Sequence, residues 1–487
     1  MSFRGAVKAL IPTGLFRKIE PWGHLAEAFL MQVLYGFPAR GLKIIGVTGT
    51  NGKTSTCFMI QRMIHGGGYK VGLMTTVGWG VGDKITPQIE HMTTMPTRQL
   101  LKRIKKLKNS RAEWIVMEVT SHALGQNRVW GIAYDIAVLT NITHEHLDYH
   151  GTFENYRDAK LKLFEKTAGN GGGLGIGVVN ADDPSAELFA KAVPRALTYG
   201  VKKGDLRAKN IKSTPSGSQF TAEAEGVKLD IKTNLPGSFN VYNALAAAGA
   251  GLALQMPPEQ IERGIAALES VEGRMNTINE GQDFEVIVDY AHTPDSFEII
   301  FNDIRKAMDS RATSLDAVQE SSEERASRTS GTASERKSVT DTAMRQEPAG
   351  AAGSAGRQGK AVRGSGRLLV MFGSAGRRDV AKRGILGEIA GKYADLVVAT
   401  EEDDRDTDGQ LILNQIAEGA EKSGKTRDKD LFLVHNREKA IKFILGRAQK
   451  GDTVLLLGKG HEKNIERGNR EDPYDEVAIT RKLLKNL

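Results

Sequence analysis

The stretch GVTGTNGKTST, from Gly46 to Thr56, follows the apolar run KII and precedes the helical pattern CFMIQRMI. A buried strand that runs through a glycine-rich turn into a helix is the context of a phosphate-binding loop. The generic spacing G-x-x-x-x-G-K-[ST] does not fit, because Val47 stands where its first glycine would be. The loop is therefore a narrower variant of the phosphate cradle, and its meaning depends on the rest of the chain.

The residue types of this loop suit ATP and Mg²⁺. Glycines let backbone N–H groups approach a polyphosphate, and the helix N-terminus adds partial positive charge. Lys53 can reach the β- and γ-phosphates, and the Thr54 hydroxyl can bind Mg²⁺. A glycine-rich turn without a nucleotide is the less favoured alternative. The predicted nucleotide-binding residues of the loop are Gly49, Thr50, Asn51, Gly52, Lys53, Thr54 and Ser55.

Composition and charge are those of a soluble globular protein with several domains. The chain has 487 residues and a formal net charge of +8, which permits a basic surface for anionic substrates but does not imply nucleic acid. Its single cysteine, Cys57, excludes a disulfide framework and a multi-cysteine zinc ribbon. We therefore expect a cytoplasmic monomer without a nucleic-acid partner.

The N-terminal segment carries the apolar stretch AEAFLMQVLYGF, from Ala26 to Phe37. This stretch is too short to cross a bilayer, and the pattern of a secretory signal is lacking. A helix packed on the nucleotide domain is the favoured interpretation, and we expect no stable membrane insertion. The alternative is a helix lying on a membrane surface, helped by the preceding basic residues Arg4, Lys8, Arg17 and Lys18.

Strand-like and helix-like runs alternate along the rest of the chain, which predicts an α/β fold with mostly parallel sheets. We expect a short helical N-terminal segment at 1–43, a central ATP-binding domain of the P-loop type at 44–274, and a Rossmann-like domain at 275–487. Residues 309–366 have no aromatic side chain and few aliphatic ones. Such a composition cannot offset the entropy of ordering, so we predict a disordered insertion there, dispensable for chemistry.

Candidate metal ligands follow the loop in the sequence. Glu118 ends the buried strand WIVMEVT, where an unpaired carboxylate is costly; it binds Mg²⁺ or pairs with a lysine. His144, His146 and His150 suggest zinc at first, but the H-E-x-x-H pattern is absent and zinc is disfavoured. Taken alone, Lys160 is interpreted as a surface lysine.

Seven motifs together resemble the Mur ligase family. TGTNGKTST, MEVTSHALGQNRV, LTNITHEHLDYHGTFENYRDAKLKLF, LPGSFNVYNALAA, GRMN, VDYAHTPDS and LLLGKGHE occur in the order that this family shows. Within the family they look most like the MurE type, the UDP-N-acetylmuramoyl-dipeptide:diamino acid ligases of peptidoglycan synthesis. The similarity covers residues 43–487 apart from the predicted insertion.

The resemblance implies a reaction and a catalytic set. ATP phosphorylates the terminal carboxylate of a UDP-sugar peptide, and the amine of an amino acid then attacks the acyl phosphate. Catalysis of this kind depends on positioning and on electrostatic stabilisation by Lys53 and metal ions. By resemblance, Thr54 and Glu118 hold one Mg²⁺ and His146 a second. Lys160 aligns with a lysine that CO₂ carbamylates, which turns a cation into an anionic metal ligand.

The resemblance also assigns the nucleotide and the donor. Asn243 is expected at the adenine, and Arg274 and Asp289, from the hinge and the second domain, match residues that touch phosphate and ribose; alternatively, neighbours simply satisfy Asp289. A Thr-Thr-Pro segment of the family reads TTMP here, with an inserted Met. The residues that correspond to the family's donor site are Thr93, Thr94, Thr120, Gln126 and Arg128.

The acceptor site matches less closely. The specificity motif Asp-Asn-Pro-Arg of enzymes that use meso-diaminopimelate reads Glu402-Asp403-Asp404-Arg405 here. Arg405 favours an acceptor with a distal carboxylate, whereas the extra acids favour a cationic one such as lysine; we lean to meso-diaminopimelate. The other residues that match the family's acceptor site are Arg378, Gly458 and Glu462.

Two local features leave alternatives. Residues 404–415 nearly fit a calcium loop, but Gln415 replaces the twelfth-position Glu, and a solvated acidic loop is favoured.

The family holds the uridine in a full N-terminal domain, whereas residues 1–43 are short; either they contact the nucleotide sugar in a reduced way or the donor differs. The competing functions are a folylpolyglutamate synthase-like ligase and a non-catalytic nucleotide-binding scaffold of cell-wall enzymes.

Overall fold

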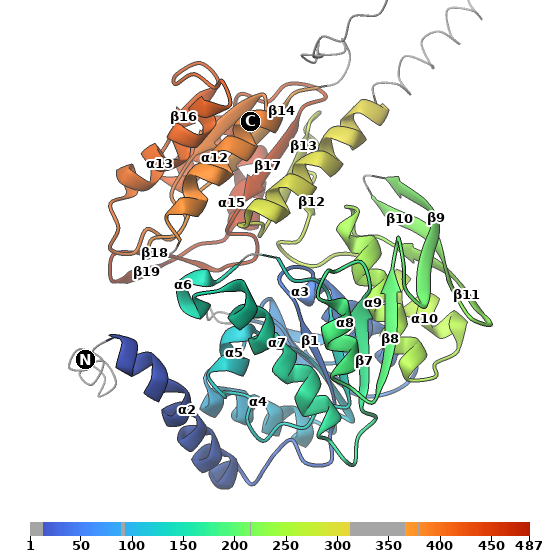
Figure 1. Ribbon diagram of the computed structural model, residues 1–487. Helices are drawn as coiled ribbons and strands as arrows, with labels where there is room; N and C mark the ends of the chain where they lie inside the picture. Colours follow the sequence, from blue (N-terminus) through green and yellow to red (C-terminus); the bar gives the residue numbers. More distant parts are fainter. Residues whose placement is uncertain (1–12, 89–92, 144, 215, 312–365, 378) are drawn as a thin grey trace, which may run out of the picture.

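The protein consists of two α/β bodies, one above the other in the view of Figure 1. A computed structural model describes residues 13–88, 93–143, 145–214, 216–311, 366–377 and 379–487. The lower body is built on an eleven-stranded sheet and the upper body on a six-stranded sheet. The predicted α/β fold class is confirmed. Among the described residues, no helix is long and apolar enough to cross a membrane.

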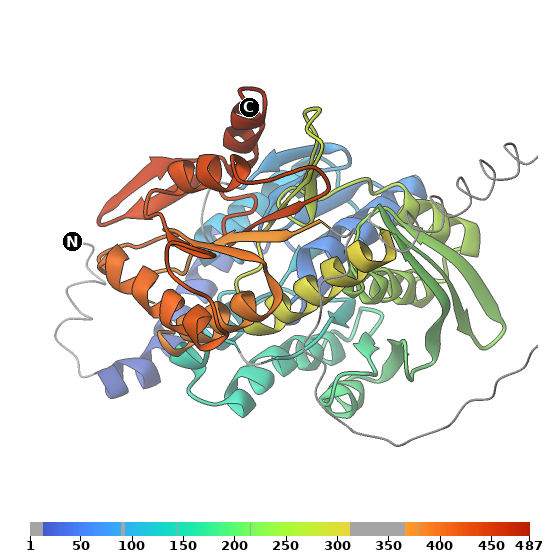
Figure 2. The same cartoon turned by 90° about the horizontal axis from the view of Figure 1, so that it is seen from above.

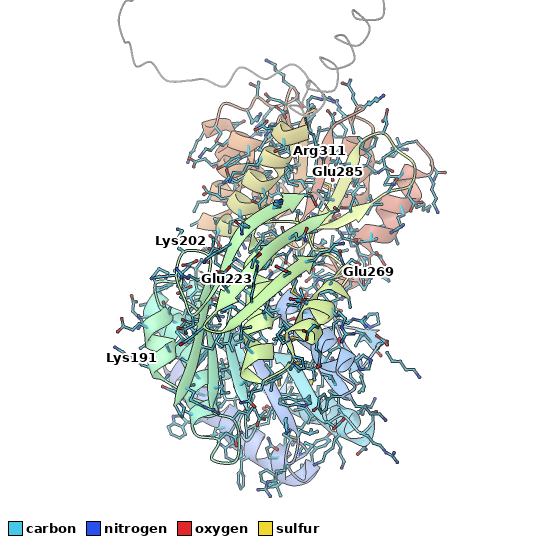
Figure 3. The ribbon with its side chains drawn as sticks, turned by 90° about the vertical axis from the view of Figure 1, so that its right-hand side faces the viewer. Lys191, Lys202, Glu223, Glu269, Glu285 and Arg311 are labelled. Atoms are coloured by element: carbon cyan, nitrogen blue, oxygen red, sulfur yellow. The ribbon has the colours of Figure 1, made fainter. Side chains whose placement is uncertain are left out.

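The large sheet has a parallel centre with antiparallel edges, in the order β11-β10-β9-β8-β7-β6-β1-β5-β2-β3-β4. Its central strands are short apolar runs whose residues are buried, as expected for parallel strands covered on both faces. Figure 3 shows the three long strands of the antiparallel edge, β9 to β11. The strands are β1 (Lys43–Thr48), β2 (Val71–Met74), β3 (Gly78–Val81), β4 (Lys84–Pro87), β5 (Trp114–Glu118), β6 (Ile136–Leu139), β7 (Ile176–Asn180), β8 (Arg195–Gly200), β9 (Leu206–Thr214), β10 (Gly217–Ala224) and β11 (Val227–Thr233).

Alternate side chains of β1 enter two separate cores, which fixes the layers. Ile45 packs with α3 (Lys53–Gly66), α9 (Phe239–Ala253) and α10 (Pro258–Ala266) on one face. Ile44 packs on the other face. The helices of that face are α4 (Thr97–Asn109), α5 (Ser121–Gly125), α7 (Phe153–Ala168) and α8 (Ala186–Lys191); the short α6 (Leu147–His150) precedes α7. Strand β1 therefore ends between two helical layers, where its loop meets α3.

The second sheet has the order β12-β13-β17-β14-β15-β16, parallel except at β12. Helices cover both of its faces, as Figure 2 shows from above. Its strands are β12 (Asn276–Ile278), β13 (Glu285–Asp289), β14 (Leu368–Phe372), β15 (Leu396–Ala399), β16 (Leu431–Leu433) and β17 (Thr453–Leu457), with the hairpin β18 (Asn464–Arg467) and β19 (Arg470–Pro473) beside them. The helices are residues 294–311, α12 (Ala381–Tyr393), α13 (Gly409–Lys422), α14 (Arg437–Leu445) and α15 (Glu476–Leu484). The predicted domain boundaries stay a prediction, although the chain changes sheets between β11 and β12.

Helix α2 (Thr13–Tyr35) includes the apolar N-terminal stretch and lies beside α4. Ala28 is buried, and Nε2 of Gln32 donates to the carbonyl of Trp130 at 2.8 Å. This is the packing on the nucleotide domain that the sequence favoured. The helix exposes Trp22, Phe29, Leu30, Val33 and Leu34 elsewhere on its surface.

The helix of residues 294–311 overlaps the segment predicted to be disordered. The prediction is wrong for residues 309–311, which are helical, because the Arg311 guanidinium forms two 3.1 Å hydrogen bonds to the Glu285 carboxylate on β13. Figure 3 labels this pair. Composition could not reveal this single long-range ion pair. Residues 312–365 of the predicted insertion lie outside the described residues.

Deleting residues 312–363 is expected to leave kcat and KM within about twofold of the parent, because the segment has no aromatic and few aliphatic side chains to contribute to a core and loop closure costs little. Steady-state kinetics of the deletion variant, with its yield of folded protein, checks this. A collapse of turnover or yield would show that the segment has a structural role.

Candidate active site

A cleft of ≈ 950 Å³ lies between the two sheets and gathers most of the predicted residues. The central domain contributes Thr50, Asn51, Gly52, Lys53, Thr54, Ser55, Thr93, Thr94, Glu118, Thr120, Gln126, Arg128, His146 and Asn243. The hinge and the second domain contribute Arg274, Asp289, Glu402, Asp403, Arg405 and Glu462. Gly49, Lys160, Asp404 and Gly458 do not line the cleft. Arg378 lies outside the described residues.

The loop between β1 and α3 requires glycine at two positions. Gly52 has φ +82°, and a Cβ there would overlap Oδ1 of Asn243. Gly49 has φ +149°, and a Cβ there would overlap Oγ1 of Thr140. The backbone is therefore packed as closely as a phosphate cradle needs, with the N-terminus of α3 at its end. Asn243 lies at the loop itself, and its predicted contact with adenine stays a prediction.

Replacing Gly52 with alanine is expected to lower the free energy of unfolding by about 1–3 kcal/mol and to weaken ATP binding, because the left-handed backbone and Asn243 both oppose a Cβ. Denaturant unfolding and nucleotide titration measure the two effects. Gly66→Ala is the matched control, since a Cβ at that position in the same helix meets nothing within 4 Å. Equal behaviour of the two variants would contradict the prediction.

Lys53 lies folded across its own loop. Its Nζ donates to the carbonyls of Gly49 at 3.0 Å and Thr50 at 2.7 Å. Burial lowers its pKa, and the nearby Glu118 and Glu145 carboxylates oppose that shift. An ammonium that contacts only carbonyl dipoles can transfer to phosphate oxygens, which are stronger partners.

Carboxylate and hydroxyl oxygens converge beside the loop. Both oxygens of the buried Glu118 accept hydrogen bonds from Thr76, from its N–H and its hydroxyl, each at 2.9 Å. The Thr54 hydroxyl accepts from Nη2 of Arg274 at 3.2 Å. The lysine partner considered for Glu118 is thus replaced by Thr76, and the oxygen donors suit a hard cation such as Mg²⁺.

Lys160 lies directly behind the loop, on the buried face of α7. Its side chain is 2% exposed, so the interpretation as a surface lysine is wrong. Its Nζ donates to the carbonyl of Gly49 at 2.7 Å and lies 4.6 Å from the centroid of the Tyr156 ring. Burial and the charge of Lys53 hold the pKa of Lys160 well below its usual range. The side chain thus favours a neutral amine.

The histidines form an aromatic cluster. The rings of His122 and His146 lie 4.6 Å apart, and Nε2 of His150 lies 3.0 Å from the Ser121 hydroxyl. His144 lies outside the described residues. The φ of His146 is positive, 56°, which is uncommon for a residue other than glycine. The described residues of this cluster include no zinc-like set of ligands.

Sequence reasoning missed Glu145, although an acid between two histidines was a visible signal. Its Oε2 lies 3.7 Å from Nε2 of His146, and its Oε1 lies 3.4 Å from Nε2 of His292. Burial alone would raise the pKa of Glu145, but His146, His292 and Lys53 outweigh it and hold the pKa well below the usual range. Glu145 is therefore held as a carboxylate among the residues that line the cleft.

Asp289 ends β13 at the far side of the cleft. Its two oxygens accept from the backbone N–H groups of Met275 and Ala291, each at 2.7 Å. Burial raises its pKa. The alternative of a strand-end carboxylate satisfied by its neighbours therefore describes its present contacts, while its place in the cleft keeps the ribose assignment as a prediction.

The predicted donor residues surround a buried guanidinium. Arg128 is 5% exposed, donates from Nη1 to the carbonyl of Thr94, and has no hydrogen-bond partner for Nε among the described residues. Burial lowers its pKa to about 10. Thr94 accepts from the N–H of Thr120 at 3.1 Å, and the inserted Met95 fills the core beneath them. A charge buried this way suits an anionic ligand.

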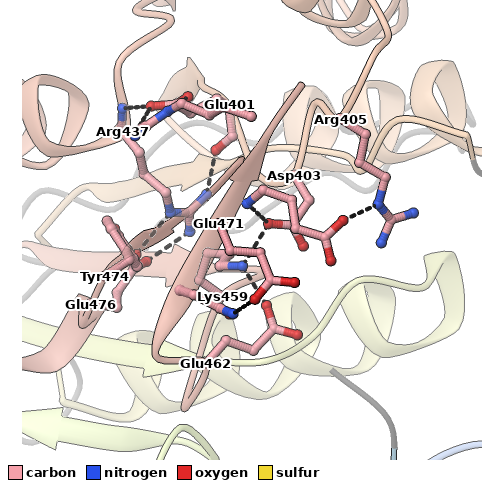
Figure 4. Close-up of polar contacts among 12 residues, drawn as sticks. Glu401, Asp403, Arg405, Arg437, Lys459, Glu462, Glu471, Tyr474 and Glu476 are labelled. Carbon is pink, nitrogen blue, oxygen red and sulfur yellow. Dashed lines mark hydrogen bonds and ion pairs between the residues drawn. The ribbon is translucent and has the colours of Figure 1, made fainter. Parts of the chain in front are cut away.

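The acidic acceptor motif is largely neutralised by partners from distant parts of the chain (Figure 4). Lys459, which is fully buried, contacts Asp403 at 2.8 Å and Glu462 at 2.5 Å. Arg405 donates to Glu466 at 2.7 Å. The extra charge of Asp403 is therefore not available to a cationic acceptor.

Glu402 is an acid of this motif that lines the cleft. Its Oε2 has no hydrogen-bond partner among the described residues, and burial raises its pKa. A Cβ at Gly458 would lie 2.6 Å from this oxygen, which explains glycine at φ +109° there. Glu402 is thus a candidate contact for an acceptor in the cleft.

Acids of the calcium-like loop at residues 404–415 form hydrogen bonds within the protein. Asp404 accepts from Nε2 of His435 at 2.6 Å, and Asp408 caps α13. The prediction of a solvated acidic loop is wrong for Asp404, which is 7% exposed. Glu401, Asp404 and His435 are close enough to hold a metal ion, but Glu401 already receives two 2.7 Å hydrogen bonds from Arg467.

Two known domains match the chain. Residues 47–251 match the Mur ligase middle domain, and residues 339–460 match the Mur ligase, glutamate ligase domain. The chain is 37% identical to the UDP-N-acetylmuramyl-tripeptide synthetase of Roseiflexus sp. (strain RS-1), covering 96% of this chain and 83% of that protein. It is 33% identical to UDP-N-acetylmuramoyl-L-alanyl-D-glutamate–2,6-diaminopimelate ligase 1 of Clostridium acetobutylicum, over 98% and 85% of the two chains.

Solved structures of two enzyme types share the fold. The structure of a UDP-N-acetylmuramoyl-L-alanyl-D-glutamate–2,6-diaminopimelate ligase is 26% identical, with a TM-score of 0.56 over 96% of this chain and 83% of that one. The folylpolyglutamate synthase of Mycobacterium tuberculosis reaches a TM-score of 0.63 over 89% and 91% at 15% identity. At that identity the second likeness shows the fold alone.

Proposed function

The chain belongs to the Mur ligase family, and we propose that it joins a diamino acid to UDP-N-acetylmuramoyl-L-alanyl-D-glutamate in peptidoglycan precursor synthesis. It is an ATP-dependent ligase, and we expect it to work in the cytoplasm. One observation carries the proposal: a single cleft joins the phosphate loop and Glu118 on one wall to Glu402 and Arg405 on the other. That arrangement brings ATP, a carboxylate and an amine together.

In the first step, an oxygen of the donor carboxylate attacks the γ-phosphorus of ATP, and the bond to the β-phosphate oxygen breaks with loss of ADP. Lys53 moves from its loop carbonyls to the phosphates and balances the negative charge. Thr54, Glu118 and His146 would hold Mg²⁺, which supplies further charge neutralisation at the phosphates. The oxygen donors beside the loop and its tightly packed glycines fit this use.

We further propose that Lys160 works as a carbamate. CO₂ adds to a neutral amine, which forms an N–C bond and releases one proton. The buried position of Lys160 favours the neutral amine that this addition requires. The product is an anion directly behind the carbonyl of Gly49, where it can orient the cationic groups of the site.

In the second step, the acceptor amine attacks the acyl carbon and loses a proton, and inorganic phosphate leaves. Glu402 suits the distal ammonium that both candidate diamino acids carry. Because Lys459 already neutralises Asp403, the acidic motif no longer argues for lysine. The relatives named for 2,6-diaminopimelate support meso-diaminopimelate as the acceptor.

The test is release of inorganic phosphate from ATP by the purified chain. UDP-muramoyl-dipeptide is offered with meso-diaminopimelate or L-lysine, and a folate with glutamate is offered in parallel. We expect turnover with the first donor and preference for meso-diaminopimelate. Turnover with the folate pair alone would overturn the proposal, and ATP binding without turnover of any pair would favour a scaffold.

A further inference from the structure

One carboxylate in the cleft connects the two domains. Glu145 precedes α6 in the central domain, and its two oxygens are divided between imidazoles of different domains. Oε2 faces His146 of the same domain at 3.7 Å, and Oε1 faces His292, just beyond β13, at 3.4 Å. The charge of Glu145 acts on both Lys53 and Lys160.

The hydrogen bonds of His292 give this contact a direction. Nδ1 of His292 lies 2.8 Å from the carbonyl of Tyr290, which can only accept, so Nδ1 carries a hydrogen. Nε2 of the same ring lies 3.4 Å from Oε1 of Glu145. The ring is therefore held between its own domain and Glu145.

A second pair joins the same two segments. Nδ2 of Asn51, in the phosphate loop, donates to Oδ2 of Asp295 at 3.2 Å. Asp295 follows His292 by three residues. This turn of the second domain therefore contacts the central domain at two residues, Glu145 and Asn51.

We propose that Glu145 is a positioning residue that holds His292, and with it the acceptor-bearing domain, in register with the phosphate loop when the cleft closes. The inference rests on the proposed function. A half-buried carboxylate is costly without partners, and His292 is the partner that the second domain supplies to Glu145. We call the contact between Glu145 and His292 the clasp. The clasp favours the geometry in which the acyl phosphate and the amine meet, although neither of its residues touches them.

The test compares Glu145→Gln, His292→Ala and the double variant in steady-state kinetics and ATP titration. We expect kcat to fall about 10- to 100-fold in each single variant, with the dissociation constant of ATP within about threefold of the parent. The double variant should lose no more than the worse single variant, because both remove the same contact. Glu145→Asp, which keeps the charge, should recover part of kcat.

The matched control removes another interdomain ion pair. Glu272 of the hinge region contacts Lys463 at 2.5 Å outside the cleft, and Lys463 keeps Asp475 as a partner. Glu272→Gln should leave kcat within about twofold. Additive losses in the double variant, or unchanged kcat in Glu145→Gln, would overturn the clasp.

Small-angle scattering separates this inference from the proposed function. A non-hydrolysable ATP analogue should compact the parent chain and compact Glu145→Gln less, a difference that needs no ligase activity. If the parent lacked ligation but this difference persisted, the clasp would stand and the reaction would be wrong. If both proteins compacted equally, the clasp would be wrong whatever the reaction.

Discussion

Replacing Lys160 with alanine is expected to lower the rate of ligation by roughly 10²- to 10³-fold while ATP still binds. The amine lies behind the loop rather than in the cleft, so its loss removes no direct contact that the lining residues offer to the nucleotide. What disappears is the buried group that can become an anion beside Lys53. Phosphate release and nucleotide titration measure the two quantities on the same preparation.

Two further measurements identify the carbamate. A small carboxylic acid should restore part of the activity of Lys160→Ala, because it can occupy the vacated space with a similar charge. The parent protein incubated with ¹³C-labelled bicarbonate should show a carbamate carbon resonance that Lys160→Ala lacks. An alanine variant as active as the parent, or a parent without the resonance, would remove the carbamate from the mechanism.

The predicted residues of the phosphate side line one cleft, and the sequence could indicate that they would meet because the parts of this side are local. The glycines and Lys53 share one loop, and Glu118 could be placed by its position at the end of an apolar run. In a parallel sheet, strand ends meet at one edge, so local patterns were enough to bring these residues together. The MurE-type resemblance added Lys160, which its own surroundings in the sequence describe as a surface residue.

Charge compensation on the acceptor side could not be predicted in the same way. Asp403 is neutralised by Lys459, 56 residues away in the chain, and Asp404 is hydrogen-bonded to His435. Composition counts these acids as available charge, whereas the fold pairs them. The same limit applies to residues 309–311, which a single ion pair to Glu285 keeps helical.

Sequence reasoning also missed the contact between Glu145 and His292. His292 belongs to a different motif and a different domain from Glu145, so no local pattern connects them. Only the arrangement of the two sheets places an acid of one domain against an imidazole of the other, at the cleft where the reaction is proposed.

Replacing Arg128 with methionine is expected to have opposite effects on stability and on donor binding. The guanidinium is 5% exposed, and its Nε has no partner among the described residues, so the free protein bears part of its desolvation cost. An apolar side chain of similar length removes that cost, and the midpoint of thermal unfolding should rise.

Donor binding should weaken in the same variant, because an anionic group of the donor loses its buried cation. Losing one partner of a buried charge pair costs about 2–5 kcal/mol, a factor of roughly 30 to 5,000 in KM for UDP-muramoyl-dipeptide. Arg128→Lys keeps the charge but not the planar guanidinium, so its donor KM should lie between those of the parent and Arg128→Met. ATP affinity, measured on the same variant, should stay constant and serves as the control. An unchanged donor KM in Arg128→Met would mean that the donor does not bind this guanidinium.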